Sequence, residues 1–294
     1  MEIKNTYSFQ VDSEIVKTFY ETQDNYLIEY SKDIEKEYCI IYFSSNDIYY
    51  PNTEDAFRSQ LINKNNFEWY KTRIHIGHKH IFIRDIQKQF YLGGINSRVS
   101  SSQKLLDFLK DETAGYQVIT VGSSSGGFAA VTYGQLLNAE RIYSFNGTFE
   151  IRSKLDFSTE AINPIIFRNL ENKEVNDWFD TRNFISHASS IFYFQSIKSA
   201  YDMKQFTHVK DLPINRIQFK NSRHGIPFLK TNLPYVLNCS TEDLQQMTGS
   251  VIQPLIFSIR TVGGIQTIFN LNKLLLIALK KIYSRVLLNY ISKK

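Results

Sequence analysis

The sequence is poor in cysteine and lacks a long apolar stretch. Its two cysteines among 294 residues, Cys39 and Cys239, are too few for a disulfide framework or a cysteine-ligated zinc site. The first residues, MEIKNTYSFQVDSEIVK, contain no apolar segment of the kind found in secretory signals, so we expect no such signal. The longest apolar run, Leu274–Leu279, is far shorter than the ~18 residues that a membrane-spanning helix needs. These absences predict a cytoplasmic protein.

Acidic residues are absent from the C-terminal end of the chain. Residues 271–294 hold six basic side chains and no acidic one, and the whole chain carries a formal net charge of +5, so residues 1–270 carry −1. A nearly neutral body does not support a nucleic-acid-binding face, and we expect no nucleic-acid partner. Within 271–294, apolar residues recur at helical spacing between the basic ones, which predicts an amphipathic helix. Such a helix contacts an anionic membrane surface, here the inner face of the cytoplasmic membrane, or a partner, or it docks on the body of the protein.

Short apolar runs separated by helix-length segments are the main pattern of the body. The runs that predict buried strands are 38–43, 81–83, 118–121, 142–145, 191–194 and 214–219. Segments 102–112 and 126–138 between them predict helices, so the fold class is α/β with a mostly parallel central sheet flanked by helices. Residues 6–11 and 25–31 alternate loosely between apolar and polar, which predicts short antiparallel strands at one edge of the sheet.

The segment 147–187 interrupts this alternation. An insertion of this length above a sheet is typical of a cap over a site, although helical packing alone also explains it. We therefore expect a catalytic domain over residues 1–250, which includes the cap, followed by a basic helical tail over 251–294.

The most informative segment contains the pattern G-x-S-x-G, formed by Gly122, Ser124 and Gly126. An apolar β-branched run, VITV, leads into it and the helix-forming run FAAVTY follows it. Strand, tight turn and helix in this order predict the nucleophile elbow of an α/β-hydrolase-like fold, with Ser124 as the nucleophile and the N–H of Ser125 as one oxyanion donor. A glycine-rich phosphate cradle is the alternative, but the segment has neither G-x-G-x-x-G nor a P-loop lysine.

A serine nucleophile needs a base, and in this fold the histidine comes last in the chain. The histidines after Ser124 are His187, His208 and His224. His224 follows the expected strand 214–219, where a loop can hang over the nucleophile. His187 precedes a strand, at the wrong end of the sheet, and His208 falls in an expected helix. The pattern favours His224 as the base.

The carboxylate that orients this base should follow the preceding strand, 191–194. Asp202 lies in the next segment, whereas Asp211 directly precedes the following strand and so belongs to the opposite end of the sheet. We therefore predict Asp202, with an ordinary helix-capping aspartate as the alternative. The polar turn after the strand 38–43 is expected to supply a second oxyanion donor, from Ser45 or Asn46, although a plain Asx-turn fits the same residues.

One further cluster resembles a metal site. His75, His78 and His80 lie close together in sequence, but their spacing suits a hairpin around Gly77, and neither an acidic residue nor a cysteine converges with them. We expect no metal.

The elbow VGSSSGGFAAV, together with Asp202 and Arg223-His224-Gly225, resembles bacterial capsular-polysaccharide O-acetyltransferases of α/β-hydrolase fold, of the polysialic-acid type. The resemblance covers residues 38–240. It implies Ser124, Asp202 and His224 as catalytic residues, acetyl-CoA as co-substrate without a permanently bound cofactor, and a polysaccharide acceptor. It leaves two alternatives: a carboxylesterase or deacetylase, and a non-catalytic accessory protein of the same fold.

Overall fold

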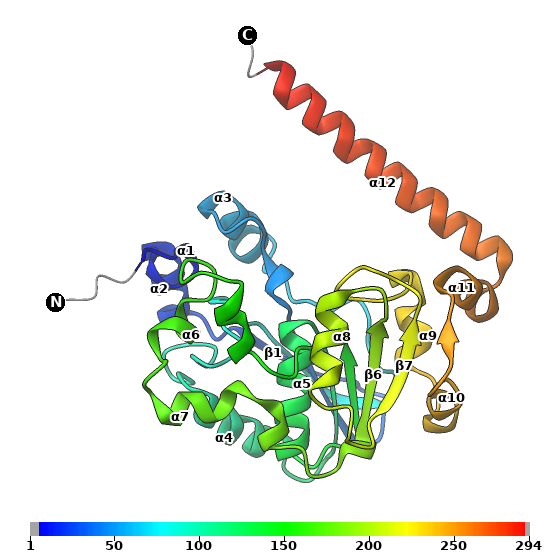
Figure 1. The fold of residues 1–294 in the computed structure, drawn as a ribbon, viewed down its shortest axis with the longest axis horizontal. Helices are drawn as coiled ribbons and strands as arrows, with labels where there is room; N and C mark the ends of the chain where they lie inside the picture. Colours follow the sequence, from blue (N-terminus) through cyan, green and yellow to red (C-terminus); the bar gives the residue numbers. More distant parts are fainter. Residues whose placement is uncertain (1–5, 292–294) are drawn as a thin grey trace.

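A single eight-stranded sheet organises the chain (Figure 1). The structure, a computed structural model, describes residues 6–291, with backbone alone at 277, 278 and 280–291. The strands are β1 (Tyr26–Tyr30), β2 (Tyr38–Phe43), β3 (Gly77–Ile83), β4 (Gln117–Ser123), β5 (Arg141–Phe145), β6 (Ile191–Ser196), β7 (Asn215–Phe219) and β8 (Val251–Ile252). They lie in the order β1-β3-β2-β4-β5-β6-β7-β8, with β1 antiparallel to β3 and the other neighbours parallel. This is the sheet of an α/β-hydrolase fold, as expected.

Helices cover both faces of the sheet. They include α4 (Ser102–Thr113), α5 (Ser125–Leu136), α8 (Ala200–Thr207), α9 (Leu233–Leu237), α10 (Thr241–Gln246) and α11 (Pro254–Val262). Side chains of α4 and α5 join one apolar core, and those of α9, α10 and α11 join the other. The central strands are buried on both faces, which explains why they read as continuous apolar runs.

The prediction for the N-terminal region is only half right. Residues 26–30 do form an antiparallel edge strand, but residues 6–11 do not form a strand: α1 (Phe9–Asp12) and α2 (Glu14–Thr22) occupy this region. In α2 the apolar residues Val16, Phe19 and Tyr20 share one face and pack into a small core beneath α3 (Glu54–Phe57). The helical spacing of these apolar residues therefore outweighs the loose alternation of residues 6–11, and the region folds as helices.

The expected hairpin around Gly77 is also wrong. Gly77 is the first residue of β3, which pairs with β2 in parallel. A side chain there would lie 2.5 Å from Ile40 and 2.6 Å from the imidazole of His80, so glycine is required by close packing and not by a turn. His80 is buried and contacts Tyr42 Oη at 3.2 Å, and burial lowers the pKa of His80 to about 4.

The segment 147–187 starts beside the elbow at the carboxyl end of β5, folds into short helices and reaches the start of β6, with α7 lying near α4 (Figure 1). They are η3 (Arg152–Asp156), α6 (Pro164–Arg168), α7 (Lys173–Asn176), η4 (Asp177–Phe179) and η5 (Thr181–Asn183). Arg168 binds Asp12 of α1 at 2.7 Å and Glu160 at 2.9 Å. The ion pair with Asp12 connects the segment 147–187 to the N-terminal helix α1.

The C-terminal region begins later than the predicted boundary at residue 250. Strand β8 still belongs to the sheet, and Phe257 of α11 is buried in the core. The expected helix is present as α12 (Gly264–Ile291), which extends away from the body (Figure 1). Residues 292–294 of the predicted tail lie outside the described residues. Within residues 6–291, none of the helices combines the length and apolarity needed to cross a membrane.

Candidate active site

Ser124 sits on a sharp turn between β4 and α5, where the sequence predicts an elbow. Its backbone has φ 53° and ψ −118°, a conformation that non-glycine residues rarely adopt. Three backbone hydrogen bonds hold this conformation: the N–H of Ser124 donates to Phe145 O at 3.1 Å, and its carbonyl accepts from Phe128 and Thr148 at 3.1 and 3.2 Å. The turn projects the side chain out of the sheet edge.

The glycines of the elbow allow three segments to approach closely. A side chain at Gly122 would collide with the carbonyl oxygen of Gly126, and one at Gly126 would collide with the carbonyl oxygens of Phe43 and Ser44. The spacing G-x-S-x-G thus permits helix α5 to start directly against β4 and against the loop that follows β2.

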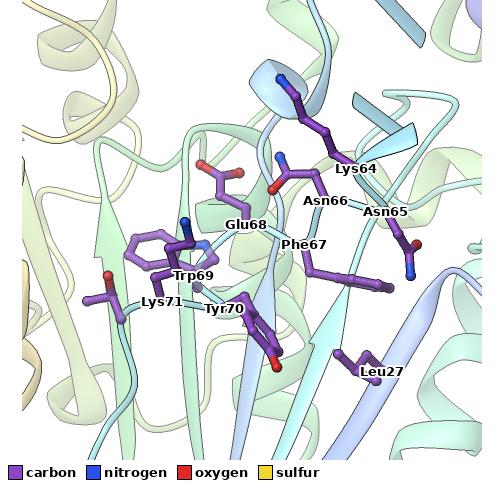
Figure 2. A pocket seen from close by; sticks show the side chains of 10 residues that line it. Leu27, Lys64, Asn65, Asn66, Phe67, Glu68, Trp69, Tyr70 and Lys71 are labelled. Carbon is purple, nitrogen blue, oxygen red and sulfur yellow. The ribbon is translucent and has the colours of Figure 1, made fainter. Parts of the chain in front are cut away.

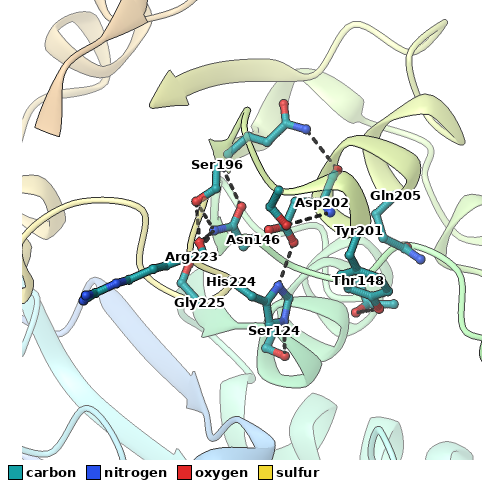
Figure 3. Close-up of polar contacts among 12 residues, drawn as sticks. Ser124, Asn146, Thr148, Ser196, Tyr201, Asp202, Gln205, Arg223, His224 and Gly225 are labelled. Atoms are coloured by element: carbon teal, nitrogen blue, oxygen red, sulfur yellow. Dashed lines mark hydrogen bonds and ion pairs between the residues drawn. The ribbon is translucent and has the colours of Figure 1, made fainter. Parts of the chain in front are cut away.

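His224 and Asp202 complete a hydrogen-bonded row that starts at Ser124 (Figure 3). The distance from Ser124 Oγ to His224 Nε2 is 2.7 Å, and the distance from His224 Nδ1 to Asp202 Oδ1 is also 2.7 Å. Asp202 is fully buried, while the side chain of His224 is 38 % exposed. This is the geometry in which a carboxylate orients an imidazole and the imidazole can take a proton from a hydroxyl.

Asp202 lies in the first turn of α8 and does not cap it. The cap is Ser199, whose hydroxyl accepts from the N–H of Asp202 at 3.3 Å. The carboxylate of Asp202 is therefore free to face His224, and the helix-capping alternative does not hold.

Asn146 anchors the loop that carries His224, and sequence reasoning missed it. Its side-chain amide donates to Ser196 Oγ at 2.8 Å, to Gly225 O at 2.8 Å and to Arg223 O at 3.3 Å, while its oxygen accepts from the N–H of Ser196 at 2.7 Å (Figure 3). Asn146 has φ 43°, a backbone region that asparagine tolerates better than most residues. The one available signal was an Asn-Gly pair directly after a strand.

Tyr201 and Thr148 line the other side of the imidazole. The ring of Tyr201 meets that of His224 edge-on, with centroids 5.3 Å apart, and its hydroxyl lies 2.9 Å from Thr148 Oγ1. Burial raises the pKa of Tyr201 to about 12, so the hydroxyl stays protonated near neutral pH. Neither residue belongs to a sequence motif.

The structure distinguishes between Ser45 and Asn46, the two candidates for the second oxyanion donor. The N–H of Ser45 donates to Glu68 Oε2 at 2.5 Å, so Ser45 is already paired and is not available in this conformation. Asn46 lies beside the elbow, where its Oδ1 accepts from the hydroxyl of Ser125 at 2.9 Å. Among the described residues no acceptor pairs with the backbone N–H of Asn46 or of Ser125. These two N–H groups remain the candidates for holding an oxyanion.

Glu68, which pairs with the N–H of Ser45, belongs to another segment of the chain. It lines a pocket of about 820 Å³ formed mainly by residues 64–72 (Figure 2), and burial raises the pKa of its carboxyl group. Its second oxygen accepts from the hydroxyl of Ser45 at 3.3 Å. Glu68 thereby fixes the start of the loop that presents Asn46.

The other histidines considered as a base do not meet Ser124. His208 binds Asp180 at 2.8 Å, and His187 precedes β6 at the opposite end of the sheet, as its place in the sequence predicts. His78 contacts the hydroxyl of Tyr116 at 3.2 Å. Among the residues that the structure describes, there is no group of three or more histidine, cysteine, aspartate or glutamate side chains that could hold a metal ion.

No protein-family model matches this chain, and no curated protein matches its sequence. Solved structures that resemble it include the capsule O-acetyltransferase of Neisseria meningitidis serogroup A, at 14% identity over 64% of this chain and 78% of that one, with a TM-score of 0.44. Another is the S-formylglutathione hydrolase of Staphylococcus aureus, at 9% identity over 74% and 87% of the two chains, with a TM-score of 0.42. A third is the Wnt deacylase Notum from Drosophila, at 13% identity over 69% and 80%, with a TM-score of 0.37. Likeness at this level carries no information about activity.

Proposed function

We propose that this protein is a serine acyltransferase in which Ser124 carries the acyl group. The observation that supports the proposal is the continuous row from Ser124 Oγ through His224 to the buried carboxylate of Asp202, with 2.7 Å at each step. A serine hydroxyl is a weak nucleophile alone, and this arrangement supplies both a base and a group that orients the base.

In the first half-reaction His224 Nε2 accepts the proton of Ser124 Oγ while this oxygen attacks the acyl carbonyl. The N–H groups of Ser125 and Asn46 stabilise the resulting oxyanion, and Asp202 stabilises the imidazolium. The leaving group departs with the proton from His224, and the acyl group stays on Ser124. In the second half-reaction His224 takes the proton of an acceptor hydroxyl, whose oxygen attacks the acyl carbonyl. The bond between this carbonyl and Ser124 Oγ breaks, and His224 returns the proton to Oγ.

The proposed donor is acetyl-CoA, and the proposed acceptor is a hydroxyl of a bacterial surface or capsular polysaccharide. Both rest on the resemblance of the elbow and of Arg223-His224-Gly225 to capsular O-acetyltransferases. Transfer in place of hydrolysis requires that water be kept from the acyl-serine, and we assign this role to the segment 147–187 beside the site. Without such exclusion the same residues would make an esterase or deacetylase.

A fluorophosphonate probe tests the nucleophile directly. We expect it to label Ser124 in the wild-type protein and to leave Ser124→Ala unlabelled, with acyl transfer reduced by about four orders of magnitude or more. Labelled acetyl-CoA with candidate glycans then separates transfer from hydrolysis. Absence of labelling, together with full biological activity of Ser124→Ala, would instead establish a non-catalytic protein.

Asp202 is tested by substitution with asparagine, which keeps the shape and removes the charge. We expect kcat to fall by about 10⁴-fold, because the imidazole would be held in the wrong tautomer. Asp211→Asn is the matched control, since Asp211 binds Arg182 on the surface and does not contact His224. Equal activity of Asp202→Asn and wild type would refute this assignment.

We propose further that α12 contacts an anionic membrane surface at the inner face of the cytoplasmic membrane. The polarity of the helix supports this: the face toward α11 is polar, with Thr267 bound to Ser258 at 3.2 Å, whereas large apolar side chains face solvent. The exposed ones among the described side chains are Ile265, Ile268, Phe269, Leu271, Leu274, Leu275, Leu276 and Leu279. Apolar exposure combined with six basic residues and no acidic one over 271–294 fits a surface of anionic lipid.

A further inference from the structure

Lys154, in η3 of the segment 147–187, lies next to the proposed active site and has no role in the mechanism above. Its Nζ is 3.0 Å from the hydroxyl of Tyr201, whose ring meets the imidazole of His224 edge-on. The same hydroxyl contacts Thr148, whose backbone N–H binds the carbonyl of Ser124 at 3.2 Å. One tyrosine side chain therefore separates this ammonium group from the base.

Aromatic rings surround the ammonium group, and no carboxylate neutralises it. Nζ lies 4.8 Å from the ring centroid of Tyr201, 5.1 Å from that of Phe90 and 5.8 Å from that of Phe157. Within the described part of the chain, no carboxylate lies within ion-pair distance of Nζ. Glu150, whose charge acts on Lys154, accepts at Oε1 from the backbone N–H of Ser153 at 2.7 Å.

This environment makes the charge costly in the free protein. Burial lowers the pKa of Lys154 to about 8, and an ammonium without a counter-ion in a half-buried site is destabilising. The aromatic rings offset part of this cost. An anionic group of a bound substrate would offset the rest, because Lys154 still has hydrogen-bond donors to offer beyond the Tyr201 hydroxyl.

We propose that Lys154 binds a carboxylate or phosphate group carried by the substrate unit that reacts at Ser124. This deepens the proposed function, on which it rests. The phosphates of acetyl-CoA are separated from its thioester by the long pantetheine arm, so an anion one tyrosine away from His224 belongs to the reacting unit itself. That unit is either the acyl group or the sugar whose hydroxyl accepts it.

Two matched pairs of substrates separate these sources. In the first pair, mono(4-nitrophenyl) succinate replaces the terminal methyl group of 4-nitrophenyl butyrate by a carboxylate, which tests the acyl group. In the second, methyl glucuronide replaces the CH₂OH group of methyl glucoside by a carboxylate, which tests the acceptor of an acetyl group from 4-nitrophenyl acetate. Each pair is measured with wild type, Lys154→Met and Lys154→Arg.

We expect the wild-type enzyme to prefer the charged member of one pair, and Lys154→Met to lower kcat/KM for that member by about 10-fold or more. The neutral member should change little, and Lys154→Arg should retain most of the preference. No preference in the wild type, or an equal loss for charged and neutral substrates in Lys154→Met, would overturn the proposal. The second outcome would make Lys154 a packing residue of the aromatic cluster.

A binding measurement keeps this test independent of the proposed chemistry. If the fluorophosphonate probe fails to label Ser124 and no ester is turned over, the proposed function is wrong. The melting temperature is then measured with methyl glucuronide, methyl glucoside, succinate or butyrate. Methyl glucuronide is compared with methyl glucoside, and succinate with butyrate, so that each pair differs by one carboxylate. A higher melting temperature with the more charged compound, lost in Lys154→Met, supports the anion site. Equal behaviour of wild type and variant refutes it.

Discussion

The backbone of Ser124 shows how a single strained residue depends on its surroundings. A non-glycine residue at φ 53° and ψ −118° costs on the order of 1–3 kcal/mol. Hydrogen bonds from Ser124 to Phe145 and from Thr148 and Phe128 to Ser124 maintain it. The conformation places Oγ within 2.7 Å of His224 Nε2, so the strained backbone presents this hydroxyl to the imidazole.

Asn46 allows an oxyanion N–H to be removed by substitution. It is the first residue of η1 (Asn46–Ile48), and Ser45 before it is extended, with φ −86° and ψ 173°. Proline is favoured at the first position of a helix and after an extended residue, so Asn46→Pro should preserve the backbone while deleting the N–H. We expect kcat for ester hydrolysis to fall by about 100-fold or more.

Asn46→Ala is the control for this variant. It keeps the backbone N–H and, like Asn46→Pro, removes the side-chain amide whose Oδ1 accepts from Ser125. A smaller loss in Asn46→Ala than in Asn46→Pro assigns the effect to the N–H. Equal activities of the two variants would show that Asn46 does not hold the oxyanion.

At the scale of elements, the close contact between α5 and the loop after β2 determines the site. Gly126 lies against the backbone of Phe43 and Ser44, so α5 and the loop after β2 fix each other's position. Gly127 likewise approaches Gly147, at the start of the segment 147–187, with only 2.6 Å between a side chain there and Gly147 Cα. Ser124, the loop after β2 and that segment therefore meet at the first turn of α5.

Gly126→Ala should disturb this contact. The added methyl group would lie 2.7 Å from Ser44 O and closer still to Phe43 O, and backbone on both sides limits relaxation. We expect the free energy of unfolding to fall by about 1–3 kcal/mol in urea denaturation, with loss of probe labelling at Ser124.

Gly264→Ala provides the comparison, because a side chain at Gly264 would meet nothing within 4 Å. Its free energy of unfolding should change by less than about 1 kcal/mol. If Gly126→Ala were as stable and as reactive as Gly264→Ala, the close contact would not be what positions the site.

At the scale of the whole molecule, α12 differs from a helix that packs on a core, because polar side chains face the body and apolar ones face solvent. Thr267 and Asn270 are buried toward the body, while Ile268 and Leu275 are 61% and 59% exposed. An exposed apolar face of this kind marks an interaction surface. Helix α12 follows α11 and extends away from the strands of the sheet (Figure 1).

The variant with Ile268→Glu and Leu275→Glu tests membrane contact. We expect the wild-type protein to sediment with vesicles of phosphatidylglycerol and phosphatidylcholine, and the variant to bind about 10-fold or more weakly. Ester hydrolysis should be unchanged in the variant, because Ile268 and Leu275 are exposed and take no part in the hydrogen-bonded row of Ser124, His224 and Asp202.

Ile62→Glu, which changes an exposed isoleucine of η2 (Arg58–Asn63), is the matched control and should bind vesicles normally. Binding of the wild type to neutral vesicles as strongly as to anionic ones would argue against the role of the basic residues. Unaltered binding of the α12 variant would argue against the helix as the contact.

The sequence by itself determined the features that depend only on short stretches of neighbouring residues. The apolar runs over 38–43 and 191–194 became buried strands with the expected starting residues, and the G-x-S-x-G pattern became a strand–turn–helix elbow. Local signals failed where two patterns competed over few residues, as in the N-terminal segment that became α1 and α2. Chain order and the direction of parallel strands were also enough to nominate His224 and Asp202.

Only the tertiary structure decided which groups meet. The contact of Ser124 with His224 joins residues 100 positions apart, and the pairing of Ser45 with Glu68, which leaves Asn46 as the candidate donor, joins residues 23 positions apart. The approach of Lys154 to Tyr201 spans 47 positions. Contacts of this kind depend on how the loops at the carboxyl end of the sheet pack against one another, and no local period or spacing in the sequence records that packing.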